Sequence, residues 1–259
     1  MSSYLEPIIR STQRRLDELR LRMVSDLERE AFEQLPPRDF LGALRQPGIS
    51  LIGEIKRSSP SAGQLKGDAD PAELARAYRD GGARALSVLT EPEFFRGSFD
   101  DLSKAKEAAA LPVLRKDFIL HHFQVLESRA EGADAVLLIV AALGETGLLA
   151  DLAAAAEELH MAALIEVHDE RELETAMEVE PKLIGINQRD LGTFSIRQDR
   201  AAALRGSVPQ AVLVVAESGI SNRAEVAALE SAGIDGVLVG EALMRAADPA
   251  AKAAELLGR

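Results

Sequence analysis

From Gly48 onward the chain alternates short apolar runs with longer amphipathic stretches. The apolar runs are rich in Val, Leu and Ile, and each is followed by a polar or glycine-containing turn. Continuous apolar runs of this length are typical of strands buried on both faces of a parallel sheet. We predict eight such strands, at Leu51–Lys56, Ala85–Thr90, Pro112–Lys116, Ala135–Val140, Ala162–Glu166, Leu183–Asn187, Val212–Glu217 and Gly236–Gly240.

The stretches between these runs have helical spacing. Asp70 and Pro71 provide an N-cap and a proline at the first helical position, ahead of apolar Leu74, Ala77 and Tyr78. The stretch from Ser221 to Glu225 is typical of a helix cap. Further helices are predicted to begin near Ser98, Gly144, Asp169, Asp199 and Asp248.

Eight strands alternating with helices indicate either a parallel barrel or a doubly wound sheet. The number of strands and the absence of a glycine-rich dinucleotide fingerprint favour the barrel. The length of 259 residues also suits a barrel, which typically needs about 250. We therefore predict an α/β fold, a single (β/α)8 TIM barrel. One domain would cover residues 1–259, with an N-terminal helical extension at 1–47 and the barrel at 48–259.

The N-terminal extension carries apolar residues at helical spacing, which predict one or two helices ending before Pro36 and Pro37. These helices could plug the bottom of the barrel or help to close an active site, and the sequence favours neither. The apolar residues are Leu5, Ile8, Ile9, Leu16, Leu19 and Met23.

Composition narrows the class of protein. There are 30 basic and 42 acidic residues, a net charge of −12, which disfavours nucleic acid and anionic membranes as partners. The chain has no cysteine, which excludes disulfides and thiolate metal sites. Its longest apolar run, Ala135–Leu143, is too short to span a bilayer, and Met1–Arg20 lacks a signal-peptide core. We expect a cytoplasmic monomer with no membrane or nucleic-acid partner.

Polar and charged side chains stand at the ends of five predicted strands. Active sites of such barrels lie at these ends, and a charge there costs desolvation energy unless it is paired or used. One such residue is usually only the start of a loop, but a converging set indicates a catalytic site. The set is Glu54, Lys56, Lys116, Glu166, Asn187 and Glu217.

Lysine is scarce in this chain, since only seven of the 30 basic residues are Lys. Two of the seven, Lys56 and Lys116, fall at strand ends. Lysine can release a proton near neutral pH when its surroundings lower its pKa, whereas arginine cannot. This is a reason to retain lysine as an acid at positions such as Lys56 and Lys116, and such a role would call for a lowered pKa.

A phosphate site is predicted by the loops after strands one, seven and eight, at Ser58–Ser61, Ser218–Ser221 and Gly240–Ala242. Backbone N–H groups after strands seven and eight form the recurrent phosphate cradle of these barrels. Glu241 is an unfavourable charge in this position unless its side chain turns away.

Six ordered motifs resemble those of the indole-3-glycerol-phosphate synthase family. They are Gly53–Ser61, Thr90–Glu91 with Phe94–Ser98, Leu114–Ile119, Ile165–His168, Gly185–Leu191 and Ala216–Ile220. The resemblance covers nearly the whole chain, including Pro37–Phe40 in the extension. It implies conversion of 1-(2-carboxyphenylamino)-1-deoxyribulose 5-phosphate to indole-3-glycerol phosphate, carbon dioxide and water. The steps are ring closure, decarboxylation and dehydration, with no metal or organic cofactor.

The resemblance also implies roles for individual residues. Lys116 would be the general acid, Glu166 an acid or base, and Lys56 a partner of the substrate's carboxylate or phosphate side and a second acid. Glu54 would hold Lys116 and Asn187, while Asn187 and Glu217 would orient substrate hydroxyls. Which lysine protonates which oxygen stays open. The substrate-binding residues would be Ser59, Ser218, Gly219 and Gly240 at the phosphate, Arg189 at the carboxylate, and Phe95 and Phe118 in the aromatic pocket.

Departures from the family pattern are small: Gln188 replaces a common Asn, and Glu241 replaces a Ser of some members. His121 and His122 are expected to be solvated loop residues, and His160 and His168 to be structural. Two other functions remain open. One is a different sugar-phosphate barrel enzyme, either an isomerase or a Schiff-base aldolase that uses a strand-end lysine. The other is an inactive or redesigned scaffold of this fold.

Overall fold

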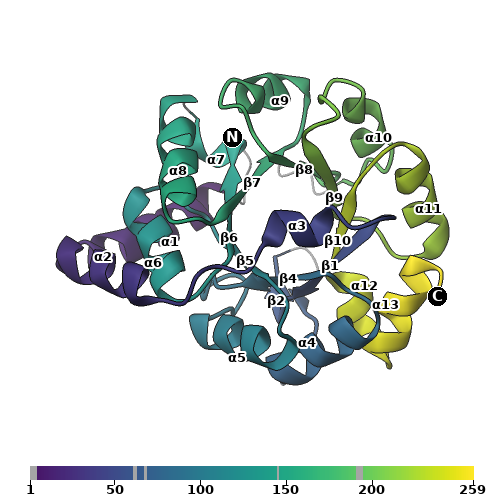
Figure 1. Cartoon of the computed structure of the whole chain (residues 1–259), viewed down its shortest axis with the longest axis horizontal. Coiled ribbons are helices and arrows are strands. Elements are labelled where there is room, and N and C mark those ends of the chain that lie inside the picture. Colours follow the sequence, from purple (N-terminus) through teal and green to yellow (C-terminus); the bar gives the residue numbers. More distant parts are fainter. Residues whose placement is uncertain (1–4, 61–62, 67–68, 145, 191–194) are drawn as a thin grey trace.

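A computed structural model describes residues 5–60, 63–66, 69–144, 146–190 and 195–259 of the chain. Eight parallel strands close into a barrel in the order β1-β10-β9-β8-β7-β6-β5-β4 (Figure 1). The predicted barrel is confirmed, and each predicted apolar run matches one strand to within a residue at either end. The barrel strands are β1 (Ser50–Ile55), β4 (Ala85–Leu89), β5 (Val113–Lys116), β6 (Ala135–Ile139), β7 (Ala162–Val167), β8 (Leu183–Asn187), β9 (Leu213–Glu217) and β10 (Gly236–Val239).

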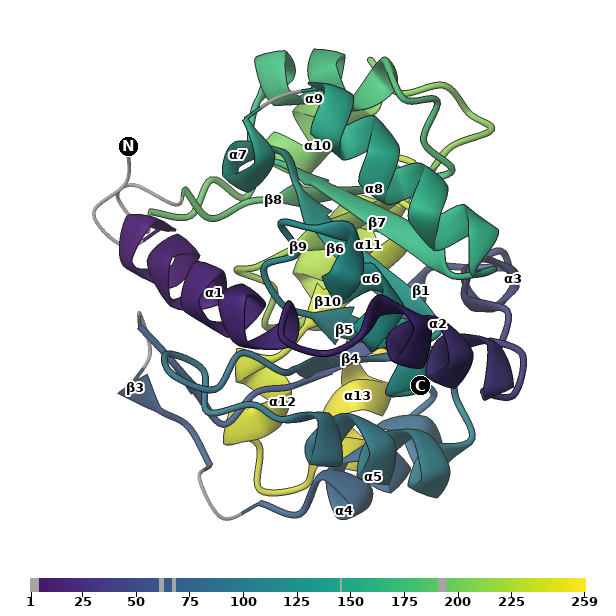
Figure 2. The ribbon, with the colours of Figure 1, turned by 90° about the vertical axis from the view of Figure 1, so that its left-hand side faces the viewer.

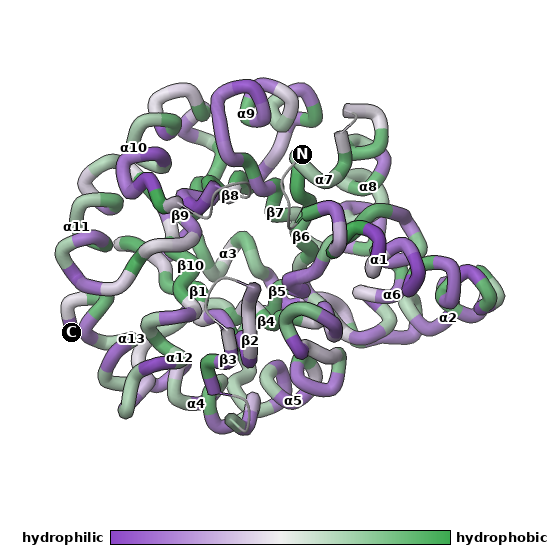
Figure 3. The backbone as a smooth tube through the Cα atoms, turned by 180° about the vertical axis from the view of Figure 1, so that it is seen from behind, coloured by the Kyte–Doolittle hydropathy of each residue, from purple (hydrophilic) through white to green (hydrophobic). Residues whose placement is uncertain are grey.

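Helices surround this ring, and the hydropathy of the chain follows the same division, with apolar segments in the strands and mixed ones outside (Figure 3). They are α4 (Pro71–Asp80), α5 (Phe99–Ala109), α6 (His122–Ala130), α7 (Val140–Leu143), α8 (Thr146–Glu158), α9 (Glu170–Met177), α10 (Arg200–Arg205), α11 (Arg223–Ser231), α12 (Glu241–Arg245) and α13 (Pro249–Leu257). The predicted cap at Asp70 is confirmed, as is a capping box of Asn222 with Glu225. A short hairpin of β2 (Ser58–Ser59) and β3 (Gly63–Gln64) follows β1.

The N-terminal extension forms three helices, α1 (Leu5–Leu19), α2 (Val24–Glu33) and α3 (Phe40–Leu44). Phe40 and Leu44 of α3 are buried within the apolar cluster of the barrel interior. The carbonyl of Leu44 accepts a hydrogen bond from Ser50, the first residue of β1, so α3 plugs the N-terminal end of the barrel. Figure 2 shows α1 on the opposite side of the ring of strands. The helices predicted before Pro36 are α1 and α2, whereas α3, which plugs the barrel, begins after Pro37 and was not predicted.

Two sets of polar contacts fix α1 above the C-terminal ends of the strands. Arg15 makes a two-pronged ion pair with Asp117, with both N···O distances at 3.0 Å. Ser11 and Arg14 both donate to the carboxylate of Glu93, at 2.5 and 2.9 Å. Asp117 directly follows the last residue of β5, so the docking of α1 is tied to a strand end.

Candidate active site

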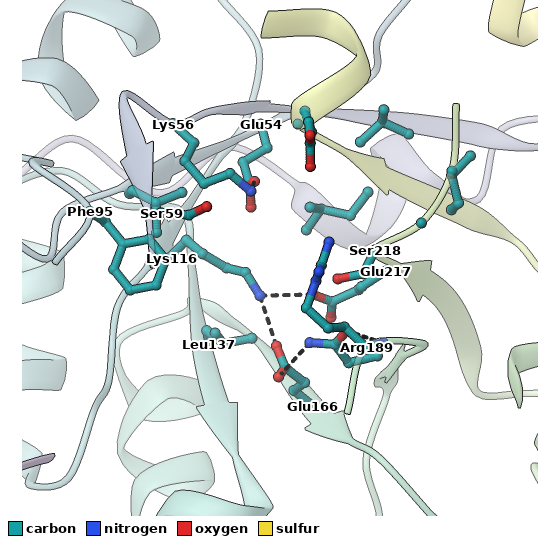
Figure 4. Close-up of a pocket in the computed structure, with 18 of the residues that line it drawn as sticks. Glu54, Lys56, Ser59, Phe95, Lys116, Leu137, Glu166, Arg189, Glu217 and Ser218 are labelled. Atoms are coloured by element: carbon teal, nitrogen blue, oxygen red, sulfur yellow. Dashed lines mark hydrogen bonds and ion pairs between the residues drawn. The ribbon is translucent and has the colours of Figure 1, made fainter. Parts of the chain in front are cut away.

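A cavity of about 480 Å³ opens at the C-terminal ends of the barrel strands, where α1 covers one side. This volume lies in the range that holds a small organic ligand. All the residues predicted as catalytic or substrate-binding line this one cavity, and Figure 4 shows their side chains converging from several strands. They are Glu54, Lys56, Ser59, Phe95, Lys116, Phe118, Glu166, Asn187, Arg189, Glu217, Ser218, Gly219 and Gly240.

Lys116 is the centre of the polar half of the cavity. Its Nζ donates to Oε2 of Glu166 at 2.8 Å and to Oε2 of Glu217 at 2.7 Å (Figure 4). These residues end β5, lie near the end of β7 and end β9, respectively, so the barrel closes three separate strands around one ammonium group. Both carboxylates are almost fully buried, and a buried charge of this kind must be paired.

The pKa of Lys116 is the opposite of the one expected from the sequence. Burial disfavours its ammonium form, but the carboxylates of Glu166, Glu217 and Glu54 outweigh burial and raise the pKa above that of a free lysine. The expectation of a lowered pKa is wrong because the sequence did not show that three carboxylates converge on this one cation. Lys116 is therefore a firmly charged group.

The two carboxylates around Lys116 differ in proton affinity. Burial disfavours the charge on Glu166, but Lys116 and His168 overcome this effect and hold the pKa of Glu166 below its usual range. Burial dominates at Glu217 and, with the nearby charge of Glu166, raises the pKa of Glu217 to about 7 despite the contact with Lys116. Pairs of titratable groups whose pKa values are pushed apart are typical of acid–base sites.

Glu54 has a different partner from the one that the family resemblance implied. Its Oε1 pairs with Nζ of Lys56 at 2.5 Å, so it holds the second lysine and acts on Lys116 only through its charge. Glu54 has room for this because the facing residue is Gly240. A Cβ at that position would lie 2.3 Å from Oε1 of Glu54.

Asn187 is likewise tied to Glu166. Its Nδ2 donates to Oε1 of Glu166 at 3.0 Å, and its own Oδ1 accepts from the backbone N–H of Arg189. Its carbonyl accepts from the buried Arg200 at 2.8 Å. The side-chain amide is thus fixed by two contacts and the backbone by a third, and Glu166 accepts from a different donor at each oxygen.

The opposite wall of the cavity is apolar. Phe95 and Phe118 face each other with ring centroids 6.4 Å apart, and Leu5 and Ile8 of α1 complete this wall with Leu137 of β6. These aliphatic residues could not be predicted as part of the site from the sequence, because a leucine or isoleucine carries no chemical signal. The spacing of Leu5 and Ile8 predicted the helix but not what it covers.

The third part of the cavity lies beside β9 and β10. Ser218 and Gly219 adopt positive φ angles of 66° and 73°, a strained conformation for a serine that is often found at functional sites. Glu241 turns to Arg245, whose Nε donates to it at 3.0 Å, so its charge is neutralised within α12. Ser61 and Leu191, which belong to the motifs above, lie outside the described residues.

The histidines lie in different surroundings. His121 and His122 stack on each other, but His121 caps α6 and His122 begins it, so the expectation of two loop residues is wrong. His160 is exposed, while His168 is buried behind Glu166 and does not line the cavity. Across the described ranges, no group of three or more His, Asp or Glu side chains is arranged to hold a metal ion. None of the helices in those ranges is long and apolar enough to cross a membrane.

Solved structures with a similar fold come from other enzymes. Thiamine phosphate pyrophosphorylase from Pyrococcus furiosus matches 80% of this chain and 93% of its own, with a TM-score of 0.59 and 20% identity. N-acetylmannosamine-6-phosphate 2-epimerase from Clostridium perfringens matches 81% of this chain and 93% of its own, with a TM-score of 0.62 and 16% identity. At such low identity these matches show the fold alone.

Comparisons of the sequence, unlike those of the fold, identify a protein family. The model of the family described as indole-3-glycerol phosphate synthase matches residues 5–256. The indole-3-glycerol phosphate synthase of Mycobacterium avium is 48% identical over 234 residues, covering 90% of this chain and 86% of that protein. Indole-3-glycerol phosphate synthase 2 of Streptomyces coelicolor is 51% identical over 238 residues, covering 92% of each. The chain therefore belongs to the indole-3-glycerol phosphate synthase family.

Proposed function

We propose that this chain converts 1-(2-carboxyphenylamino)-1-deoxyribulose 5-phosphate to indole-3-glycerol phosphate, with release of carbon dioxide and water. The observation that carries the proposal is the ammonium of Lys116 between Glu166 and Glu217, facing an aromatic wall in one cavity. A ring-closing reaction on an aromatic sugar phosphate needs a proton donor, a proton acceptor and an apolar seat for the ring, and these groups supply all three.

Lys116 acts as the general acid of ring closure. Attack of the aromatic ring on the sugar carbonyl places negative charge on the carbonyl oxygen, and a cation beside it stabilises that charge. The raised pKa keeps Lys116 protonated until the alkoxide forms, and an alkoxide is basic enough to take its proton.

Glu166 moves the remaining protons. Its lowered pKa leaves it as a carboxylate, able to accept a proton from the ring or the anilinic nitrogen. Its Oε2 lies 2.8 Å from Nζ of Lys116, so a proton taken up by Glu166 can return to the lysine. Asn187 keeps the carboxylate in this orientation, and Glu217 is placed to contact a substrate hydroxyl from the other side of Lys116.

The substrate's ends bind to separate parts of the cavity. Phe95 and Phe118 hold the aromatic ring, and Arg189 and Lys56 supply positive charge for its carboxylate, with Lys56 also serving as a second acid in dehydration. Ser59, Ser218, Gly219 and Gly240 bind the phosphate, with the backbone N–H groups after β9 and β10 as the main donors. Loss of carbon dioxide is favoured where the ring is held in an apolar wall and its carboxylate loses solvation.

We further infer that the chain works as one domain and as a cytoplasmic monomer. Leu5 and Ile8 of its own α1 close the cavity, so no second copy is needed to complete the site. Light scattering should give the mass of a single 27.8 kDa chain at enzyme concentrations that support turnover. A stable dimer under those conditions would contradict the monomer.

The reaction is tested by mixing the purified chain with the carboxyphenylamino sugar phosphate and following indole absorbance and fluorescence. Borohydride added during turnover separates this function from a Schiff-base aldolase, because only an imine would be trapped as a covalent adduct. Indole product without an adduct at Lys116 or Lys56 supports the proposal.

A further inference from the structure

His168 is the first residue after β7 and lies directly behind Glu166. Side chains two residues apart on a strand share a face, so His168 and Glu166 both point toward the barrel interior. Its Nε2 is 3.3 Å from Oε1 of Glu166. His168 is buried and does not line the cavity, so it meets Glu166 from the side away from the substrate.

Glu172 of α9 holds the imidazole in place. Its Oε2 accepts from the backbone N–H of His168 at 2.8 Å and lies 2.9 Å from the ring Nδ1. The backbone N–H of Glu172 is in turn capped by Asp169 at the start of α9. One ring nitrogen is therefore anchored to a helix, and the other is directed at Glu166.

The Nε2 atom of His168 is buried and has no aligned hydrogen-bond partner among the described residues. A buried donor in this state is uncommon and calls for a functional explanation. Among the described residues, the charged groups within 4 Å of the ring nitrogens are Glu166 from β7 and Glu172 from α9, and both are carboxylates. A ring between two carboxylates is stabilised as the doubly protonated imidazolium, because each nitrogen can then donate to one carboxylate.

We propose that His168 is a positioning residue for Glu166, a permanent cation that keeps this carboxylate oriented and favours its return to the ionised form between proton transfers. The inference rests on the proposed function, in which Glu166 accepts and returns protons. Lys116 neutralises Glu166 only while the lysine is protonated. When Lys116 gives its proton to the substrate, the positive charge beside Oε2 of Glu166 is lost. The imidazolium of His168 beside Oε1 remains.

The pKa of the His168 ring agrees with this geometry. Burial disfavours the imidazolium, but the close carboxylates of Glu166 and Glu172 reverse this effect and raise the pKa of His168 to about 9. A ring charged at pH 7 lowers the pKa of Glu166 in turn, as does Lys116.

Three variants test the role. H168N keeps an amide near the position of Nδ1 and loses the contact with Glu166, whereas H168Q can place a neutral donor near Nε2. H160N is the matched control, because His160 is exposed and its φ of 59° suits asparagine. We expect H168N to lower kcat about 10-fold, the scale of a misplaced catalytic group, with KM changed less than about 2-fold.

The pH profile separates positioning from a purely structural role. Removal of a cation beside Glu166 should move the acidic limb of the kcat profile to higher pH by about one unit in both H168N and H168Q. H168Q should recover part of kcat but not the shift, since it restores the donor and not the charge. H160N should match the parent protein in both measurements.

A direct titration keeps the proposal testable if a variant fails to fold. The ¹⁵N and ¹H signals of the His168 ring in the unmutated protein should stay those of an imidazolium until about pH 9. The E172Q variant should lower that midpoint. A His168 ring that is neutral at pH 7, or an H168Q profile that coincides with the parent's, would overturn the proposal. Absence of indole product from the parent protein would instead overturn the proposed function.

Discussion

Replacement of Lys116 by methionine should change both turnover and stability, in a way that depends on pH. The side chain is similar in length, but the buried Glu166 and Glu217 lose the cation that lies 2.8 and 2.7 Å away. Glu217 can take up a proton, since its pKa is already raised to about 7, so the main uncompensated charge is that of Glu166. Removal of one partner of a buried pair costs about 3–5 kcal/mol. We expect the lower end, about 3 kcal/mol at pH 8, because His168 remains.

The pH dependence follows from the pKa of Glu166 in each protein. In the parent the folded pKa lies below the unfolded value, so this carboxylate stabilises the fold above the unfolded pKa, and the contribution is lost as pH falls. Without Lys116, the charge of His168 alone does not offset burial, so the folded pKa of Glu166 rises above its unfolded value. The contribution of Glu166 is then present at low pH and lost as pH rises through that pKa. The stability difference should shrink to about 1 kcal/mol at pH 5.

Urea unfolding followed by circular dichroism at pH 5 and pH 8 measures this difference. Lys182→Met is the matched control, because Lys182 pairs with Glu157 in an exposed position and should change stability by less than about 0.5 kcal/mol. Turnover of Lys116→Met should fall at least about 100-fold. A stability difference that is equal at the two pH values, or turnover near that of the parent, would refute the reasoning.

Three further changes probe other parts of the site. Arg15→Ala should release α1 from Asp117, raise KM several-fold with a smaller effect on kcat, and speed the amide hydrogen exchange of α1. An unchanged exchange rate would show that the Arg15–Asp117 ion pair does not hold α1 in place. Gly240→Ala should push Glu54 away from its pocket and lower kcat/KM about 10-fold, whereas retained activity with Glu54 unmoved in a crystal structure would disprove the steric argument. Glu217→Gln should remove any titration near pH 7 from the kcat profile, and its persistence would assign that titration to another group.

The sequence predicted the barrel well because the signals of its elements are local. Runs of apolar residues marked all eight strands, and side-chain caps such as Asp70 and Asn222 marked helix starts. Helices α3, α6 and α7 were not predicted individually, and two of these omissions have a physical reason. Helix α7 continues the apolar run of β6, so hydropathy does not separate them. Helix α3 has five residues, which is too short to show a helical period.

The residues of the site were predicted, but the ion pairs and hydrogen bonds between them were not. Strand-end positions identified Lys116, Glu166 and Glu217, because such ends meet at one mouth in a barrel. The pairing of Glu54 with Lys56, and the raised pKa of Lys116, depend on which of several nearby charges approach most closely. Glu54 and Lys56 are neighbours at one strand end, but the approach of Glu166 and Glu217 to Lys116 is set by side-chain packing across strands far apart in the sequence, and no spacing along the chain encodes it.

Product formation from the carboxyphenylamino sugar phosphate tests the central claim most directly. Purified protein at pH 7 should produce the absorbance and fluorescence of an indole together with one equivalent of carbon dioxide, while the folded Lys116→Met variant should lose at least about 99% of that rate. A well-folded parent protein that yields no indole, or a variant that yields it at the parent rate, would contradict the account.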